Sequence, residues 1–121
     1  MTAVPGKYNI TVKQGSSFSQ KFVYENSAGV PYNLTGYGAK MQVREYFNGP
    51  VLLELTTDNG KLVITPLTGE IEMILKPLDT KSLNFSKAIY DLDIYIGNNV
   101  YTLFEGVFTL NSEVTKDVIS V

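Results

Sequence analysis

The 121-residue sequence contains no cysteine, no histidine and no tryptophan. Without cysteine there are no disulfides, no thiolate nucleophiles and no cysteine-ligated zinc sites. Without histidine, the most common general base is missing, which excludes Ser-His-Asp catalysis and histidine-ligated metal sites. These absences lead us to expect a protein that is not an enzyme and that uses no cofactor or metal.

Long apolar runs and basic runs are absent as well. Residues 51–53 are typical of the apolar runs, and none approaches the roughly 20 residues that span a bilayer. Residues 1–6 have neither a basic nor an apolar signal region, so we expect no signal peptide. The ten lysine and arginine residues are scattered and the net charge is −2, whereas nucleic-acid binding needs a concentrated basic face. We therefore expect neither a membrane nor a nucleic-acid partner.

The residues that are present indicate β-structure. Eight tyrosines and six phenylalanines accompany many Val, Ile and Thr residues, which pack well on a pleated surface. Apolar and polar residues alternate in nearly every segment, most clearly where Ala39, Met41 and Val43 are expected to face inward. Turn residues separate the segments at intervals of roughly 8–12 residues. The pattern predicts that residues 1–121 form one all-β domain, a sandwich or barrel of about eight short strands.

Three segments depart from this pattern. Residues 77–86 are compatible with a single helical turn, capped by Asp79 or Thr80, with Leu78 and Leu83 facing the core. The alternation fails around Gly106, where a glycine suits either a β-bulge or a crowded backbone. Residues 1–6 and 111–121 are less periodic, and we expect them to be arms.

One carboxylate pair is the remaining candidate for chemistry. Asp91 and Asp93 lie two residues apart in a predicted strand and therefore on the same face. Such a pair could bind a hard cation or act as in a glycosidase. We favour the alternative of a solvated sheet face opposite Tyr90 and Leu92.

Several aromatic residues are placed where burial is difficult. Tyr46 and Phe47 lie beside a turn, and Tyr95 and Tyr101 flank another hairpin. They could pack at strand edges, stack on a sugar or anchor a protein contact. Of the two functional alternatives we favour the protein contact, because a sugar platform usually also includes tryptophan. The candidate interface residues are Tyr46, Phe47, Tyr95, Tyr101, Val114, Val118 and Ile119.

Short elements spread over nearly the whole chain also carry a family resemblance. In order they are Gln14-Gly15 with Phe18, Asn33–Tyr37, Met41–Arg44, Leu53–Thr56, Thr68–Ile71, Tyr90–Leu92, Gly106 and Glu113–Thr115. Their order resembles that of phage and prophage tail-associated proteins. It is also similar to the N-terminal immunoglobulin-like domain of phage baseplate upper proteins. The resemblance implies an immunoglobulin-like antiparallel β-sandwich with at most one short helical turn.

The resemblance also implies a function. It indicates a bacteriophage structural protein, made in the host cytoplasm and located in the virion, that serves as a tail, neck or baseplate adaptor. Its partners would be other virion proteins, in a homo-oligomer or another multi-copy assembly. Baseplate upper proteins continue into a helical stalk and a receptor-connecting part, whereas this sequence stops at Val121, so we expect a stand-alone adaptor. The alternatives are a capsid cement or decoration protein, and a carbohydrate-binding module for host-surface attachment.

Overall fold

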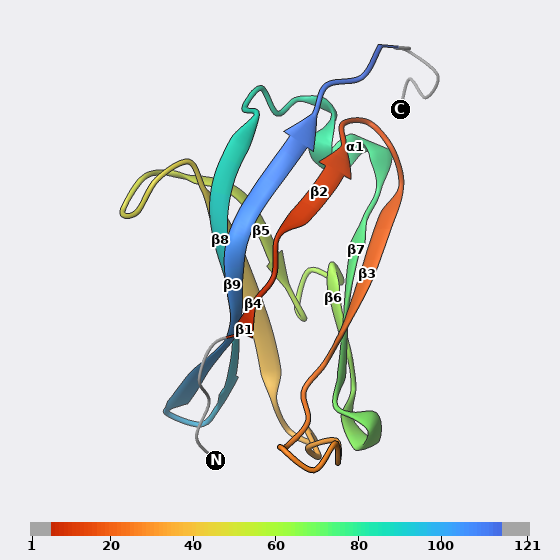
Figure 1. Cartoon of the computed structure of the whole chain (residues 1–121), viewed down its shortest axis with the longest axis vertical. Coiled ribbons are helices and arrows are strands. Elements are labelled where there is room, and N and C mark those ends of the chain that lie inside the picture. The colour runs from red at the N-terminus through yellow and green to blue at the C-terminus, as the bar shows by residue number, and fades with distance from the viewer. Residues whose placement is uncertain (1–5, 115–121) are drawn as a thin grey trace.

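The computed structural model describes residues 6–114 and consists of two β-sheets packed face to face (Figure 1). The strands are β1 (Gly6–Lys7), β2 (Ile10–Lys13), β3 (Phe18–Val23), β4 (Gly38–Arg44), β5 (Val51–Thr56), β6 (Leu62–Thr65), β7 (Glu70–Leu75), β8 (Lys87–Ile96) and β9 (Asn99–Asn111). The large sheet has the order β1-β9-β8-β4-β5, with β2 also paired to β9, and the small sheet has the order β3-β7-β6. The predicted all-β sandwich is confirmed, with nine strands within residues 6–114 where about eight were predicted.

One edge of the large sheet departs from the antiparallel expectation. β1 and β2 run parallel to β9, while the other strand pairs within residues 6–114 are antiparallel. Residue alternation has the same period in both kinds of pair, so it carries no information about strand direction. The segment after β2 crosses to the small sheet, where β3 pairs with β7, and so it does not form a β2–β3 hairpin.

The strand order matches the immunoglobulin fold. Taken in chain order from β2, the strands β3, β7 and β6 correspond to B, E and D, and β4, β8 and β9 correspond to C, F and G. β5 takes the place of C′ beside β4. Strand A lies beside G instead of beside B. Antibody domains pack a tryptophan on a B–F disulfide. This chain has no tryptophan and no cysteine, and its core consists largely of aliphatic and phenylalanine side chains.

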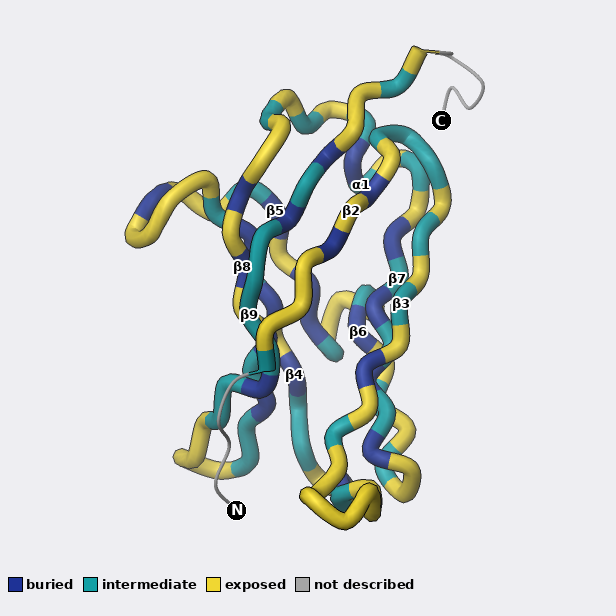
Figure 2. The backbone as a smooth tube through the Cα atoms, in the orientation of Figure 1, coloured by how far each residue is buried: buried dark blue, intermediate teal, exposed yellow. Residues whose placement is uncertain are grey.

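The core is formed by the inward residues of both sheets (Figure 2). Ala39, Met41 and Val43 of β4 are completely buried, as the alternation predicts. Across the sandwich, the ring of Phe22 in β3 packs against that of Phe104 in β9, with centroids 5.0 Å apart. Because a side chain of this size contributes roughly 1.5–3 kcal/mol when buried, one continuous core stabilises the domain without disulfides.

The helical prediction is confirmed in part. Residues Pro77–Lys81 form α1, and the Asp79 carboxylate accepts a hydrogen bond of 2.7 Å from the Lys76 backbone N–H, so Asp79 caps from the third position of the helix. The prediction for Leu78 was wrong: its side chain is 52% exposed, because it lies on the outer side of this single turn. A second helical turn, at Pro66–Thr68, was not predicted; it is a 3₁₀ turn that ends at Gly69, whose φ is 64°.

Gly106 marks a crowded backbone, not a bulge. A Cβ atom at this position would lie 2.2 Å from the backbone oxygen of Tyr8, where the chain passes from β1 to β2. The extra residue of β9 is Leu103, which lies between the partners of Leu92 and Asp93. The crowding and the bulge are therefore separate features of β9.

One residue of each predicted arm belongs to the large sheet. Gly6 is paired with Phe104 in β1, and Asn111 is the last residue of β9, paired with Lys13. Backbone pairing at both ends therefore places these two residues in the sheet. The remainder of the proposed arms, apart from residues 112–114, lies outside the described residues.

Candidate functional site

The outer surface of the large sheet carries many polar and charged side chains. Because side chains alternate along each strand, the residues between the buried positions of β4, β5, β8 and β9 point away from the core. This surface, called the polar face below, comprises Lys40, Gln42, Arg44, Glu54, Asp91, Asp93, Tyr95, Thr102 and Glu105. The sequence prediction that Asp91 and Asp93 share a solvated face is confirmed.

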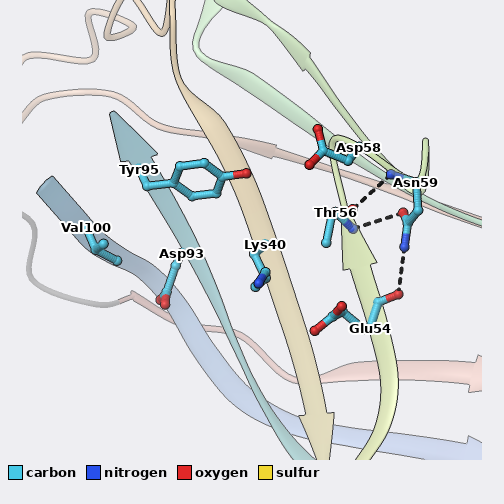
Figure 3. A pocket seen from close by; sticks show the side chains of 8 residues that line it. All are labelled: Lys40, Glu54, Thr56, Asp58, Asn59, Asp93, Tyr95 and Val100. Atoms are coloured by element: carbon cyan, nitrogen blue, oxygen red, sulfur yellow. Dashed lines mark hydrogen bonds between the residues drawn. The ribbon is translucent and has the colours of Figure 1, made fainter. Parts of the chain in front are cut away.

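Two hollows lie on this face and meet at Asp93. The first, the Tyr95 hollow, is lined by Lys40, Glu54, Asp58, Asp93, Tyr95 and Val100, together with Thr56 and Asn59 (Figure 3). The second, the Phe47 hollow, lies toward the β4–β5 hairpin and includes Arg44, Phe47, Ile89, Asp91, Asp93 and Glu105. The polar face thus has two neighbouring hollows, one lined by Tyr95 and the other by Phe47.

The ring of Tyr95 lies close to the sheet because the residue opposite it has no side chain. Its cross-strand partner in β4 is Gly38. A Cβ atom on Gly38 would lie 2.5 Å from Cζ of Tyr95, so the ring occupies the space that a larger residue would fill. Figure 3 shows this ring extending from β8 across β4 at the border of the hollow.

Hydrogen bonds fix several side chains of the polar face. Arg44 Nη2 donates to Gln42 Oε1 over 2.8 Å, and Gln42 Nε2 donates to Glu54 Oε2 over 2.7 Å. The Thr102 hydroxyl donates to Asp93 Oδ1 over 2.7 Å. Neutral donors hold two of the carboxylates in place, so the negative charge of these groups is kept.

The pKa of Asp91 depends on the charges around it on the polar face. Burial raises its pKa above the ordinary value, and the nearby carboxylates of Asp93 and Glu105 raise it further, while Arg44 lowers it. Within residues 6–114 its carboxylate has neither a hydrogen bond nor a cation within 4.0 Å, since the ion pairs there join Lys7 to Glu105, Lys21 to Glu70 and Lys61 to Asp79. Negative charge at the centre of the polar face is therefore only partly neutralised.

The β4–β5 hairpin presents two exposed aromatic residues from a braced turn. Tyr46 is 60% exposed and Phe47 is 82% exposed. Asn48 has a φ of 64°, the Gly49 N–H donates to the Tyr46 carbonyl over 2.8 Å, and the Arg44 guanidinium donates to the Gly49 carbonyl. The Tyr46 ring packs against Gly49, whereas Phe47 points outward.

The predicted interface residues do not form one cluster. Tyr46 and Phe47 follow the end of β4, while Tyr95 is paired with Gly38 at its start. Tyr101 is half-buried and packs against the core, because its register opposite the buried Ile94 turns it inward. Val114 is 90% exposed. Val118 and Ile119 lie outside the described residues.

The charged residues that join Tyr95 in its hollow were not predicted from the sequence. Lys40, Glu54 and Asp58 come from two strands and a turn. The outward position of Lys40 follows from alternation, but its neighbours follow from the β4–β5 and β4–β8 registers. Within residues 6–114 there is no group of three or more Asp, Glu, His or Cys side chains able to hold a metal ion.

Comparisons with known proteins give little beyond the fold. No protein-family model matches the chain, and no curated protein matches it. Solved structures do match, and one of them comes from a study of multimeric cell-adhesive interactions of VGSC beta subunits by photo-crosslinking. That chain is 14% identical, with 95% of this chain and 98% of that chain covered and a TM-score of 0.47. At this level of similarity no function or partner is transferred. Among the described residues, no helix has the length and apolar character needed to cross a membrane.

Proposed function

We propose that this chain is a protein–protein assembly module of a bacteriophage virion, an adaptor of the tail, neck or baseplate. The feature that carries the assembly role is Phe47, an 82% exposed phenylalanine at the tip of a braced hairpin. The assignment to a virion is supported by the ordered sequence elements that resemble phage tail-associated proteins. We assign no catalytic step to the polar face.

The hairpin suits the role of an anchor in an interface. Aromatic side chains that insert into a partner's pocket dominate many interfaces, and their contribution is greatest when little conformational entropy is lost on binding. Arg44, Asn48 and Gly49 already fix the turn around Phe47 in the free chain. Transfer of the Phe47 ring into a partner contributes on the order of 1.5–3 kcal/mol. In a symmetric assembly, many copies add such contacts together.

The carbohydrate-binding alternative has one supporting observation. Tyr95 lines a hollow with three carboxylates, and a tyrosine ring beside hydrogen-bond acceptors is also a feature of sugar sites. The hollow and the Phe47 hairpin lie at opposite ends of β4. The two functions therefore make separate predictions for separate residues.

The assembly role is tested by replacing the anchor. Phe47→Ser should leave the free energy of unfolding within about 0.5 kcal/mol of wild type, because the residue is exposed. It should reduce incorporation of the chain into particles about tenfold or more, which corresponds to the lost ring contact. Incorporation is measured by quantitative immunoblot of purified particles from cells that supply the variant in place of the wild-type chain.

Leu67→Ser is the matched control. Leu67 is a 76% exposed apolar residue in the 3₁₀ turn next to the small sheet, away from the hairpin. Its replacement should leave incorporation unchanged. Absence of the wild-type chain from purified particles would overturn the virion assignment, and equal incorporation of the Phe47→Ser and wild-type chains would overturn the role of the hairpin.

A further inference from the structure

The Tyr95 hollow has an excess of negative charge. Glu54, Asp58 and Asp93 supply three carboxylates, whereas Lys40 is the one cationic residue among the described residues that line the hollow. None of the ion pairs within residues 6–114 joins Lys40 to any of these carboxylates. The hollow is therefore complementary to a cationic ligand.

The carboxylates are held ready for such a ligand. Asp93 accepts from the Thr102 hydroxyl, and Glu54 accepts from the Gln42 side chain, each over 2.7 Å. Both donors are neutral and each occupies one oxygen, so the second oxygen and the charge remain available. Burial and the neighbouring carboxylates also raise the pKa of Asp91 beside the hollow, which indicates a negative field along this part of the sheet.

The aromatic ring narrows the choice of cation. Tyr95 lies low over Gly38 at the border of the hollow (Figure 3). A guanidinium is planar, stacks on aromatic rings and makes bidentate hydrogen bonds to carboxylates, whereas an ammonium is a more strongly hydrated point charge. A ring beside several carboxylates matches the first of these cations better.

We propose that the Tyr95 hollow receives an arginine side chain from a protein partner, with the guanidinium against the Tyr95 ring and bonded to Asp93, which lies two residues away on the same strand and the same face. The inference rests on the proposed function, because the arginine belongs to the protein with which this chain assembles. A second copy of this chain does not supply it. The sequence contains a single arginine, Arg44, whose guanidinium is already bonded to Gln42 and to the Gly49 carbonyl.

The test is a titration of the ¹⁵N-labelled chain with Nα-acetyl-arginine amide, followed by two-dimensional amide spectra. Shifts should concentrate at residues 38–40, 54–59 and 93–95. The neutral isostere Nα-acetyl-citrulline amide should leave these signals unchanged. Methyl glucoside and maltotriose are titrated in parallel as sugar ligands.

Variants assign the binding to the hollow. Asp93→Asn and Tyr95→Leu should each weaken arginine amide binding about threefold or more, in line with the loss of one charged or cation–π contact. Glu72→Gln is the matched control, because it removes a carboxylate from the outer face of the small sheet without breaking an ion pair within residues 6–114. It should not change binding. The amide spectrum of each variant reports whether the fold is kept.

Each outcome of the titration either supports or overturns the arginine site. Concentrated shifts with arginine amide alone, weakened in both hollow variants, support the inference. Shifts with the sugars and not with arginine amide overturn it in favour of a sugar site. Equal response to citrulline, or shifts spread over all acidic residues, overturn it as well. If the chain is present in particles but arginine amide does not bind in the hollow, the arginine inference is wrong and the virion assignment stands. If arginine amide binds but the chain is absent from particles, the virion assignment is wrong and the arginine inference stands.

Discussion

The hydroxyl of Tyr90 donates a hydrogen bond of 2.6 Å to the backbone carbonyl of Tyr8. Tyr8 and Asn9 separate β1 from β2, and the Tyr8 carbonyl receives this hydrogen bond from a side chain of β8. The Asn9 side chain supplies an acceptor for β9 at this point, since its Oδ1 accepts a hydrogen bond from the Val107 N–H over 3.0 Å. This arrangement keeps β1 and β2 in one register along β9 despite the interruption.

Tyr90→Phe should destabilise the domain by about 1–3 kcal/mol, because it leaves the Tyr8 carbonyl without its hydrogen-bond donor in a partly buried place. The measurement is the free energy of unfolding in urea at pH 7. Tyr46→Phe removes the same atom from a 60% exposed ring and should change stability by less than about 0.3 kcal/mol. Equal effects of the two substitutions would contradict a structural role for the bond.

The same tyrosine predicts a dependence on alkaline pH. Burial, and to a smaller extent Tyr8, raises the pKa of Tyr90 well above its ordinary value of 10.0. The folded state therefore keeps its proton where the unfolded state loses it, so the stabilisation is fully present below pH 10 and is lost progressively above it. Wild type should lose up to about 1.4 kcal/mol per pH unit more than Tyr90→Phe above pH 10. Urea midpoints of both proteins at pH 7 and pH 10.5 test this, and parallel curves would contradict it.

Gly106→Ala should destabilise the domain by about 2–3 kcal/mol, as overpacking does when the neighbour cannot move freely. The added Cβ would lie 2.2 Å from the Tyr8 backbone oxygen and 2.8 Å from its carbonyl carbon, and backbone atoms yield less readily than a side-chain end. Gly6→Ala is the control, because its Cβ would contact the movable ring of Phe104 at 3.1 Å. We expect it to change stability by less than about 1 kcal/mol. Thermal and urea unfolding measure both.

Gly106 also shows what could be predicted from the sequence. The failure of alternation near this glycine indicated an unusual backbone, and crowding was one of the two alternatives. The partner that crowds it, Tyr8, lies almost a hundred residues earlier in the chain. Its contact depends on the parallel pairing of β2 with β9, and a period-two pattern is the same for parallel and antiparallel strands.

The candidate site was predictable to a similar extent. Alternation correctly placed Asp91 and Asp93 outside and Met41 inside, and the turn signal correctly marked Phe47 as hard to bury. Tyr101 was counted among the residues that are hard to bury because it flanks a hairpin, but its register opposite the buried Ile94 turns it inward. The meeting of Tyr95 with Glu54 and Asp58 depends on two strand registers, which local patterns do not determine.

Asp91→Asn should stabilise the domain at neutral pH. Because the folded-state pKa is raised by burial and by Asp93 and Glu105, with Arg44 opposing them, ionised Asp91 disfavours folding. This effect is fully present well above the folded pKa and is gone below the unfolded value of 3.8. The carboxyl group is only partly buried, so screening by solvent limits the gain to about 0.5 kcal/mol at low salt, and less at 1 M salt. Urea unfolding at pH 7 and pH 3, with Glu72→Gln as control, tests the sign; a loss of stability at pH 7 would contradict it.

Gly38→Ala separates the shape of the Tyr95 hollow from the stability of the fold. The added methyl group would meet the far end of the Tyr95 side chain, at 2.5–2.6 Å from Cζ, Cε2 and the hydroxyl oxygen. This end of a flexible side chain can swing away, so the free energy of unfolding should fall by less than about 1 kcal/mol. The ring would then stand off the sheet, and arginine amide binding in the hollow should weaken about threefold, as for Tyr95→Leu. The same amide titration measures it, with Gly29→Ala as control, because a Cβ at Gly29 contacts nothing within 4 Å, its φ is likewise positive at 80°, and its loop does not line the hollow. Unchanged binding in Gly38→Ala would show that the position of the ring over Gly38 has no part in the hollow's affinity.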